Sequence, residues 1–303
     1  MRTMQPVLQP RVWGGTLIPE YFGGSPADEP IGEAWLLSDH PSGKTLDESG
    51  EDLSDLRHGR RWFPVMIKLL HAKADLSVQV HPNDEQAAVI GDLGKTEGWL
   101  ILAADDGARI CYGHDAATAQ EFRRTIEEKR IETCLRYVVV KQGEYYPVPA
   151  GTVHALGAGM LVLEVQEASD TTYRLYDYNR PDQHGKLRDL HIEQGLKVAS
   201  FPQPDVPNDR SIPWQTEDGM NCRVLDRNSY YTFKQVQVDG QFEAKTAPES
   251  ATCVILLAGD VAPTLPTRAG NAPFVYQTWL YEPGERVTLS GHGEVAVIEI
   301  PLA

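Results

Sequence analysis

The chain has 303 residues, 41% hydrophobic and 23% charged, which is the composition of a globular protein with room for one large domain or two smaller ones. Its formal net charge of −15 argues against nucleic acid or an acidic membrane surface as a partner, because like charges repel at long range. The N-terminal residues lack the apolar core of a secretory signal, and no segment approaches the roughly 18 consecutive apolar residues of a membrane span, so we expect a cytoplasmic protein.

Short runs rich in Val, Ile, Leu and Tyr recur between turn signals from residue 64 onward, among them PVMIKLL, GWLILA, RYVVVKQG and MLVLEVQE. Strands do not alternate regularly with helices, so the pattern predicts an antiparallel β-sandwich or barrel. Helical periodicity is confined to three places, which we expect to decorate the β core: residues 84–93, 116–136 and 187–201.

Four prolines interrupt residues 201–215 and predict a linker there. Beyond it, the runs YYTFKQVQV, ATCVILLAG and EVAVIEI indicate further strands. We therefore divide the chain into a first domain, residues 1–205, and a smaller β domain, residues 206–303. The second domain contains one histidine, His292, and we expect it to bind no metal.

The four cysteines are widely separated and form no Cys-x-x-Cys pair, so neither a disulfide framework nor a thiolate zinc site is indicated. We expect them to be buried as small hydrophobic side chains: Cys111, Cys134, Cys222 and Cys253.

The stretch ADLSVQVHPND places polar side chains at every second position of a predicted strand. Ser77, Gln79 and His81 therefore share one face. Alone, this pattern also fits a solvated edge strand. A second segment, KQGEYYPVPAGTVHALGAG, adds a turn at Pro149-Ala150-Gly151 that delivers His154 onto the next strand.

Glu97 is the last residue of GKTE and stands at the head of the very apolar run GWLILA. A carboxylate is costly in such a place unless a cation compensates its charge. A metal ion could do so, or Lys95 as a structural ion pair. Two imidazoles, one carboxylate and one amide oxygen form a donor set that suits Zn²⁺, and also Fe²⁺, Mn²⁺ or Co²⁺.

The second segment fits the metal motif of the cupin superfamily through Gly143, Pro149, Gly151 and His154, with Ala158 where an asparagine is often found. The order PVMIKLLHAKADLSVQVHPND, GKTEGW, YYPVPAGTVHAL and LEVQEASDTTYRLYDYNR resembles the short bacterial form of type I mannose-6-phosphate isomerase, a metal-dependent cupin enzyme. VWGG near residue 12 and GEAWLLSDH near residue 32 also resemble that family, and the likeness spans roughly residues 5–200.

The resemblance implies a cupin-type double-stranded β-helix (jelly roll) with decorating helices and a second β domain without metal. It also implies one divalent metal ion, with Zn²⁺ as the expected ion. The implied ligands are Gln79, His81, Glu97 and His154. Gln79 is the weakest of them, because an amide could instead orient a neighbour or a water.

The resemblance also implies an active-site role for Arg174, in EASDTTYRLYDYNR. Its guanidinium could hold a sugar phosphate or stabilise an enediolate, although a surface strand with a stacked arginine is the alternative. Isomerisation of an aldose to a ketose moves a proton from carbon 2 to carbon 1 and needs a base. The candidates are Asp170 and a metal-bound water, with Glu164 and Glu167 as weaker ones.

Three further side chains are expected at the substrate: Lys95, Lys68 and Ser77. For Lys68, pairing with a structural carboxylate is an equally good expectation. The remaining histidines lie outside the matched motifs and are expected to be structural or exposed.

We expect the protein to interconvert mannose 6-phosphate and fructose 6-phosphate, as a monomer or homodimer. Two alternatives remain open, because fold alone does not fix function. The first is a cupin isomerase acting on another sugar or sugar phosphate, and the second is a sugar-binding cupin without catalysis.

Overall fold

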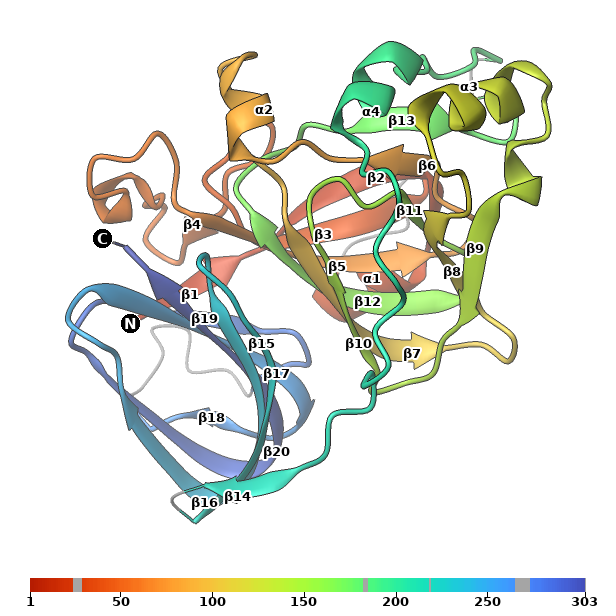
Figure 1. Ribbon diagram of the computed structural model, residues 1–303. Helices are drawn as coiled ribbons and strands as arrows, with labels where there is room; N and C mark the ends of the chain where they lie inside the picture. The colour runs from red at the N-terminus through yellow and green to blue at the C-terminus, as the bar shows by residue number, and fades with distance from the viewer. Residues whose placement is uncertain (24–28, 182–184, 218, 265–272, 303) are drawn as a thin grey trace.

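The computed structural model of the chain describes residues 1–23, 29–181, 185–217, 219–264 and 273–302. Three antiparallel sheets dominate it (Figure 1). Two of them face each other in the part that we call the first domain, and the third curls into a barrel-like part that we call the C-terminal domain. The described helices are not long and apolar enough to cross a membrane.

The first sheet has six strands in the order β10-β7-β12-β5-β3-β2. Their bounds are β2 Val7–Gly15, β3 Ile31–Leu37, β5 Val65–Ala72, β7 Glu97–Ala104, β10 Tyr145–Val148 and β12 Met160–Glu167. The second sheet has the order β13-β6-β11-β8-β9. Its bounds are β6 Val78–Val80, β8 Arg109–His114, β9 Leu135–Val139, β11 His154–Leu156 and β13 Tyr173–Tyr176.

The three predicted helices exist but are shorter than their periodicity suggested: α2 Asp84–Ala88, α3 Ala119–Glu127 and α4 Ile192–Val198. The Asn83 side chain and Gln86 form a capping box that starts α2, and Gly91, with φ of 70°, follows soon after its end. Lys129 adopts a φ of 56° just beyond α3, which is incompatible with continuing that helix. A further helix, α1 Leu17–Phe22, and a 3₁₀ turn, Ser54–Leu56, were not predicted. The end of the predicted helical segment 116–136 contains a separate 3₁₀ turn, Ile131–Thr133.

The third sheet has nine strands in the order β14-β15-β16-β20-β17-β19-β1-β4, with β18 paired to β20. Its C-terminal strands are β14 Gln215–Glu217, β15 Met220–Arg227, β16 Thr232–Lys245, β17 Ser250–Gly259, β18 Ala262–Pro263, β19 Thr278–Tyr281 and β20 Arg286–Pro301. Two strands come from the start of the chain, β1 Arg2–Gln5 and β4 Leu46–Asp47. No helix or strand occurs in residues 199–214, where the prolines predicted a linker.

The six-stranded sheet is buried on both faces, because alternate residues of its strands enter different cores. On β12, Leu163 and Val165 pack in the core shared with the C-terminal domain, which includes Phe233 and Ile298. Val162 packs instead with Trp99 and the five-stranded sheet. The sequence of a strand that is covered on both faces is a nearly continuous apolar run, as in MLVLEVQE.

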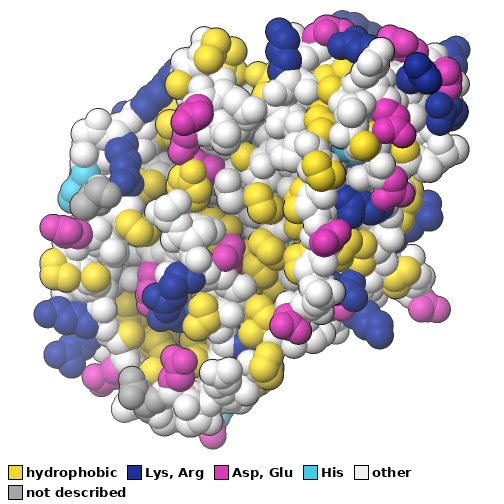
Figure 2. Space-filling view, in the orientation of Figure 1, with side chains coloured by type: hydrophobic (Ala, Val, Ile, Leu, Met, Phe, Trp, Pro, Cys, Tyr) yellow, Lys and Arg dark blue, Asp and Glu magenta, His cyan; other side chains and the backbone are white. Residues whose placement is uncertain are grey.

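Cys111, Cys222 and Cys253 are buried and Cys134 is partly buried, and all four are free thiols. The prediction of buried cysteines is therefore confirmed for three of them. Figure 2 shows acidic and basic side chains interspersed over one face of the molecule, without a single broad basic surface.

Candidate metal centre and catalytic cavity

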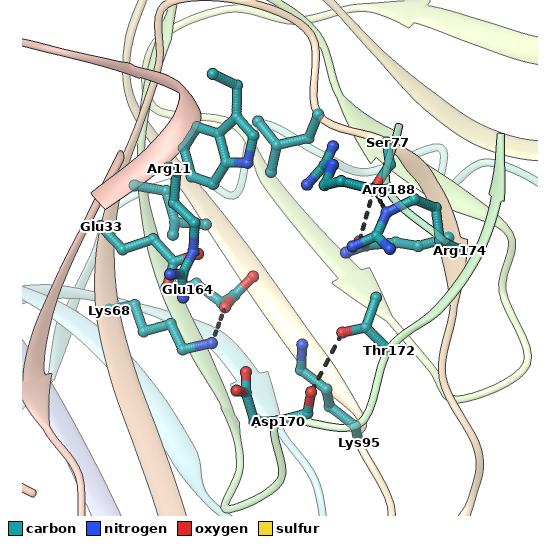
Figure 3. Close-up of a pocket in the computed structure, with 14 residues that line it drawn as sticks. Arg11, Glu33, Lys68, Ser77, Lys95, Glu164, Asp170, Thr172, Arg174 and Arg188 are labelled. Carbon is teal, nitrogen blue, oxygen red and sulfur yellow. Dashed lines mark hydrogen bonds and ion pairs between the residues drawn. The ribbon is translucent and has the colours of Figure 1, made fainter. Parts of the chain in front are cut away.

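A cavity of about 440 Å³ opens between the two sheets of the first domain. Figure 3 shows charged side chains around it, with Arg174 and Arg188 on one side and Lys68, Glu164, Glu33 and Arg11 on the other. The lining residues are Arg11, Trp13, Glu33, Lys68, Leu70, Leu76, Ser77, Gln79, Lys95, Glu164, Asp170, Thr172, Arg174 and Arg188. All three side chains predicted to contact substrate are among them, as are both predicted catalytic residues.

Three buried side chains, His81, Glu97 and His154, place possible ligand atoms within 4.8 Å of one another. Nε2 of His154 lies 3.2 Å from Oε1 of Glu97, and Nε2 of His81 lies 3.6 Å from Oε2. Each of the three is only 1% exposed. They are the sole group of this kind within the part of the chain that the structure describes.

The turn predicted at Pro149-Ala150-Gly151 explains how two distant motifs meet. Gly151, with φ of 86°, donates its N–H to the carbonyl oxygen of His81 at 2.9 Å. The chain then enters β11 with His154 directly opposite Gln79 of β6. A non-glycine residue at 151 would be strained in this left-handed conformation.

Both imidazoles are oriented by backbone carbonyls. Nδ1 of His81 lies 2.9 Å from the oxygen of Thr171, and Nδ1 of His154 lies 2.9 Å from that of Thr152. A carbonyl only accepts, so each Nδ1 carries the proton and each Nε2 keeps its lone pair. Burial and the Lys95 ammonium lower the pKa of His81 well below its usual value, and burial lowers that of His154 to about 4. Both rings are neutral at pH 7.

Glu97 indicates most clearly that this group suits a cation. Neither of its carboxylate oxygens has a hydrogen-bond partner among the described residues. Burial raises the pKa of Glu97, and Lys95, whose Nζ lies 3.5 Å from Oε2, opposes this only in part. Two neutral imidazoles and an unsatisfied carboxylate fit a divalent metal ion of the nitrogen/oxygen type.

Gln79 lies next to the His-Glu-His group. Its Nε2 lies 3.4 Å from Nε2 of His154, and its Oε1 lies 3.5 Å from the hydroxyl of Ser77. Because a half-turn exchanges the two amide atoms, either one can face the cluster.

One side of the cavity is cationic (Figure 3). Nε of Arg174, on β13, donates to the Ser77 hydroxyl at 3.2 Å, and its Nη1 donates to the carbonyl oxygen of Asp189 at 2.9 Å. Nη2 of Arg188 lies 2.6 Å from Asp177, which anchors it. Two guanidinium groups and a hydroxyl therefore line one end of the cavity, a suitable arrangement for an anion.

The opposite wall is a network of alternating charges. Nζ of Lys68 lies 3.6 Å from Glu164, so the alternative expectation for this lysine, a carboxylate partner, is met while its side chain still lines the cavity. Arg11 contacts both carboxylate oxygens of Glu33 at 2.8 and 3.0 Å. Burial and the neighbouring Glu97 raise the pKa of Glu164.

Four charged or aromatic lining residues were missed from the sequence: Arg11, Trp13, Glu33 and Arg188. Arg11 directly precedes VWGG, Trp13 lies within it, and Glu33 lies in GEAWLLSDH. The resemblance of these two stretches to the family could therefore have pointed to three of the four residues. Glu167, a weaker base candidate, is not among the lining residues and instead accepts the N–H of Thr96 at 2.7 Å.

A two-sheet jelly roll that holds a buried His-Glu-His group beside a polar cavity defines a metal-binding enzyme of the cupin type. Residues 1–105 match the model of the phosphomannose isomerase type I catalytic domain. Mannose-6-phosphate isomerase ManA of Bacillus subtilis is 39% identical over 256 residues, covering 80% of this chain and 80% of that protein. A mannose-6-phosphate isomerase of Streptococcus mutans is 35% identical over 273 residues, 85% of each chain. The chain therefore belongs to the type I phosphomannose isomerase family.

Solved structures agree with this assignment. The crystal structure of the mannose 6-phosphate isomerase from Bacillus subtilis superposes with a TM-score of 0.80 at 32% identity and covers 98% of both chains. A solved structure from Archaeoglobus fulgidus, at 19% identity, shares the fold with a TM-score of 0.72.

Proposed function

We propose that the protein interconverts mannose 6-phosphate and fructose 6-phosphate with one Zn²⁺ held by His81, Glu97 and His154, with Gln79 as a further ligand. The observation that carries this proposal is the arrangement of the cavity. Arginine and carboxylate side chains line one space of about 440 Å³, within the range of small-molecule sites. The buried His-Glu-His group adjoins this cavity, because two of its lining residues, Lys95 and Gln79, lie 3.5 Å from Glu97 and 3.4 Å from His154.

The cationic end of the cavity suits the phosphate. Arg174 and Arg188 can each offer paired N–H donors to phosphate oxygens, and Ser77 adds a hydroxyl. With a net charge of −15, the protein repels anions at long range, so a local pair of guanidinium groups is needed to retain a doubly charged substrate.

The proton between carbon 2 and carbon 1 needs a carboxylate that can accept and return it. Asp170 and Glu164 both line the cavity, and either can serve. Burial and Glu97 raise the pKa of Glu164, which favours its taking up a proton, and Nζ of Lys68 lies 3.6 Å from its carboxylate. Asp170 lies nearer Arg174 in sequence, and its position beside Lys95 is seen in Figure 3.

A metal ion held by His81, Glu97 and His154 would polarise a substrate oxygen and so favour loss of the neighbouring proton. Lys95, 3.5 Å from Glu97, holds positive charge on the same side of the cavity and can donate to a substrate hydroxyl. Thr172 and Gln79 add polar groups to the wall, and Trp13, Leu70 and Leu76 restrict access of water.

The test is a coupled assay of zinc-loaded protein on mannose 6-phosphate, free mannose and glucose 6-phosphate. We expect turnover of mannose 6-phosphate in large excess over the other two, since only it has both the phosphate and the correct carbon 2. Faster turnover of another sugar would favour a different isomerase, and binding without turnover would indicate a sugar-binding cupin. Light scattering in the same preparation would separate monomer from homodimer.

A further inference from the structure

A turn of the C-terminal domain reaches the back of the metal site. It joins β15 to β16, and we call residues 226–231 the buttress turn. Its Tyr231 is fully buried. A Cβ built on Gly98 of β7 would overlap the hydroxyl of Tyr145 and would lie 2.9 Å from the hydroxyl of Tyr231. Gly98 is thus in close contact with two tyrosines at the domain interface.

Gly98 directly follows Glu97, and side chains alternate along a strand. Glu97 and Trp99 point into the site, where Nε1 of Trp99 donates to Glu164 at 2.9 Å. Gly98 and Leu100 face the other way, into the core shared with the C-terminal domain. The two tyrosine hydroxyls therefore contact β7 on the face opposite to the Glu97 side chain. These contacts limit how far β7 can move away from the two histidines.

The buttress turn is itself fixed by hydrogen bonds. The Tyr145 hydroxyl donates to Oδ2 of Asp226 at 2.9 Å. The Asn228 side-chain oxygen accepts the N–H groups of Tyr230 and Tyr231 at 2.9 and 3.0 Å, and its amide donates to Asp226 at 3.1 Å. A turn bonded in this way presents Tyr231 in one position.

A second contact reaches the other ligand segment. The Tyr230 hydroxyl donates to Oδ2 of Asp84 at 2.9 Å, in the first turn of α2. Oδ1 of Asp84 accepts the N–H of Gly94 at 2.9 Å. Asp84 follows His81 by three residues, and Gly94 precedes Glu97 by three. Tyr230 is therefore joined to the chain just after one candidate ligand and just before another.

We infer that the buttress turn positions the metal ligands, so that the C-terminal domain contributes to metal affinity without touching metal or substrate. Tyr230 and Tyr231 are positioning residues in this account. The inference rests on the metal site proposed above. Outer partners of metal ligands typically change affinity by about 10–100-fold when removed, and we expect effects in that range.

The experiment measures the Zn²⁺ affinity of the full-length chain by competition with a chromogenic chelator. Tyr231→Ala, which opens space behind Gly98, should weaken affinity about 10-fold or more, and Tyr230→Phe several-fold. The matched control is Tyr281→Ala, because Tyr281 is a buried tyrosine of the same domain, 2% exposed, in the core of the C-terminal barrel. It should lower the melting temperature while leaving zinc affinity unchanged.

Zinc affinity within twofold of wild type in Tyr231→Ala, or an equal loss in Tyr281→Ala, would overturn the inference. If Tyr231→Ala fails to fold, Tyr231→Phe and Tyr230→Phe decide on the same readout, and unchanged affinity in both overturns it. Wild-type protein that binds zinc but does not isomerise mannose 6-phosphate would contradict the proposed function alone. Wild-type protein that binds no zinc would contradict both.

Discussion

Nδ1 of His81 lies 2.9 Å from the carbonyl oxygen of Thr171, so a candidate metal ligand is held by the residue next to Asp170. Asp92 fixes the same segment, accepting hydrogen bonds from the hydroxyls of Thr171 and, at 3.2 Å, Ser169. The segment that carries Asp170, and Arg174 shortly after it, is thereby tied to the metal cluster. Hydrogen bonds therefore link the proposed metal site to the segment that carries the candidate catalytic side chains.

Replacing His154 by alanine should remove metal and turnover together. The loss of one of three or four ligands lowers affinity and opens the coordination geometry. We expect zinc content after dialysis to fall at least tenfold, with turnover falling in proportion. His71→Ala, in β5 and outside the cavity lining, is the control and should keep both. Full zinc content in His154→Ala would remove this histidine from the ligand set.

Arg174→Ala should behave differently, because Arg174 is not one of the candidate metal ligands and its guanidinium bonds Ser77 and Asp189 instead. Zinc content should survive, while turnover should fall by about 10²–10³, the usual effect of losing a positioned donor at developing charge. Arg174→Lys should recover little, since an ammonium cannot reproduce the planar two-pronged contact.

Metal content and turnover are measured on the same preparations of both Arg174 variants. Arg123→Ala is the control, because Arg123 pairs with Glu193 on the surface of α3. Near-normal turnover in zinc-loaded Arg174→Ala would return Arg174 to a purely structural role.

Lys68→Met tests the charged wall of the cavity. Lys68 is 3% exposed and Glu164 is 5% exposed, so the substitution leaves a buried carboxylate without its cation. Breaking such a pair typically costs about 3–5 kcal/mol in the free energy of unfolding. Lys234→Met breaks a more exposed pair, with Glu299 at 2.6 Å, and should cost less than about 1 kcal/mol. Urea unfolding of both variants compares them, and equal losses would show that the Lys68 pair is not specially stabilising.

The metal-site histidines and their spacing could be predicted from the sequence, because each lies in a short local motif. Gln79 and His81 share a strand face by simple alternation, and the turn at Gly151 places His154 opposite them. Glu97 was suggested by the cost of a carboxylate at the head of an apolar strand. Each of these signals depends on residues a few positions apart.

Two residues of the opposite wall, Arg11 and Glu33, could not be derived in that way. Arg11 and Glu33 reach the cavity because β2 and β3 extend the same sheet as β5, a long-range pairing that no local spacing encodes. The predicted lengths of the helices were too long for a related reason. The apolar periodicity continues past Ala88 and Glu127, where the helices end. Gly91 and Lys129 adopt positive φ angles shortly after these ends, so the helices cannot continue.

The role of the C-terminal domain also lay outside local sequence patterns. The domain division at residue 205 stays a prediction, yet the structure adds that β1 and β4 belong to the C-terminal sheet. His292 pairs with Asp239 at 2.8 Å, and the expectation that this domain binds no metal stays a prediction too.

Acid stability offers a test away from the active site. His114 stacks on Phe122 with ring centroids 4.2 Å apart, and burial lowers its pKa to about 4. As the pH falls below the ordinary value of about 6.5, the unfolded chain takes up a proton that the folded chain refuses. Stability attributable to His114 is therefore complete above about pH 6.5 and is lost on the way down to pH 4.

His114→Phe should flatten the dependence of the unfolding free energy on pH in that window. The slopes of wild type and variant should differ by nearly one proton, equivalent to about 1.4 kcal/mol per pH unit. Chemical denaturation at several pH values from 4 to 7 measures both slopes. Parallel curves would mean that the ring is protonated in the folded protein.

The central claim is that one metal ion, held in a preformed cupin barrel, is required for the isomerisation. Because apolar cores lie on both faces of the six-stranded sheet, we expect the fold to persist without the ion. The decisive measurement is turnover of mannose 6-phosphate by chelator-treated protein, verified as folded by circular dichroism, before and after adding Zn²⁺. We predict no turnover before the addition and recovery after it, with an unchanged dichroism spectrum. Undiminished turnover in metal-free, folded protein would contradict the account.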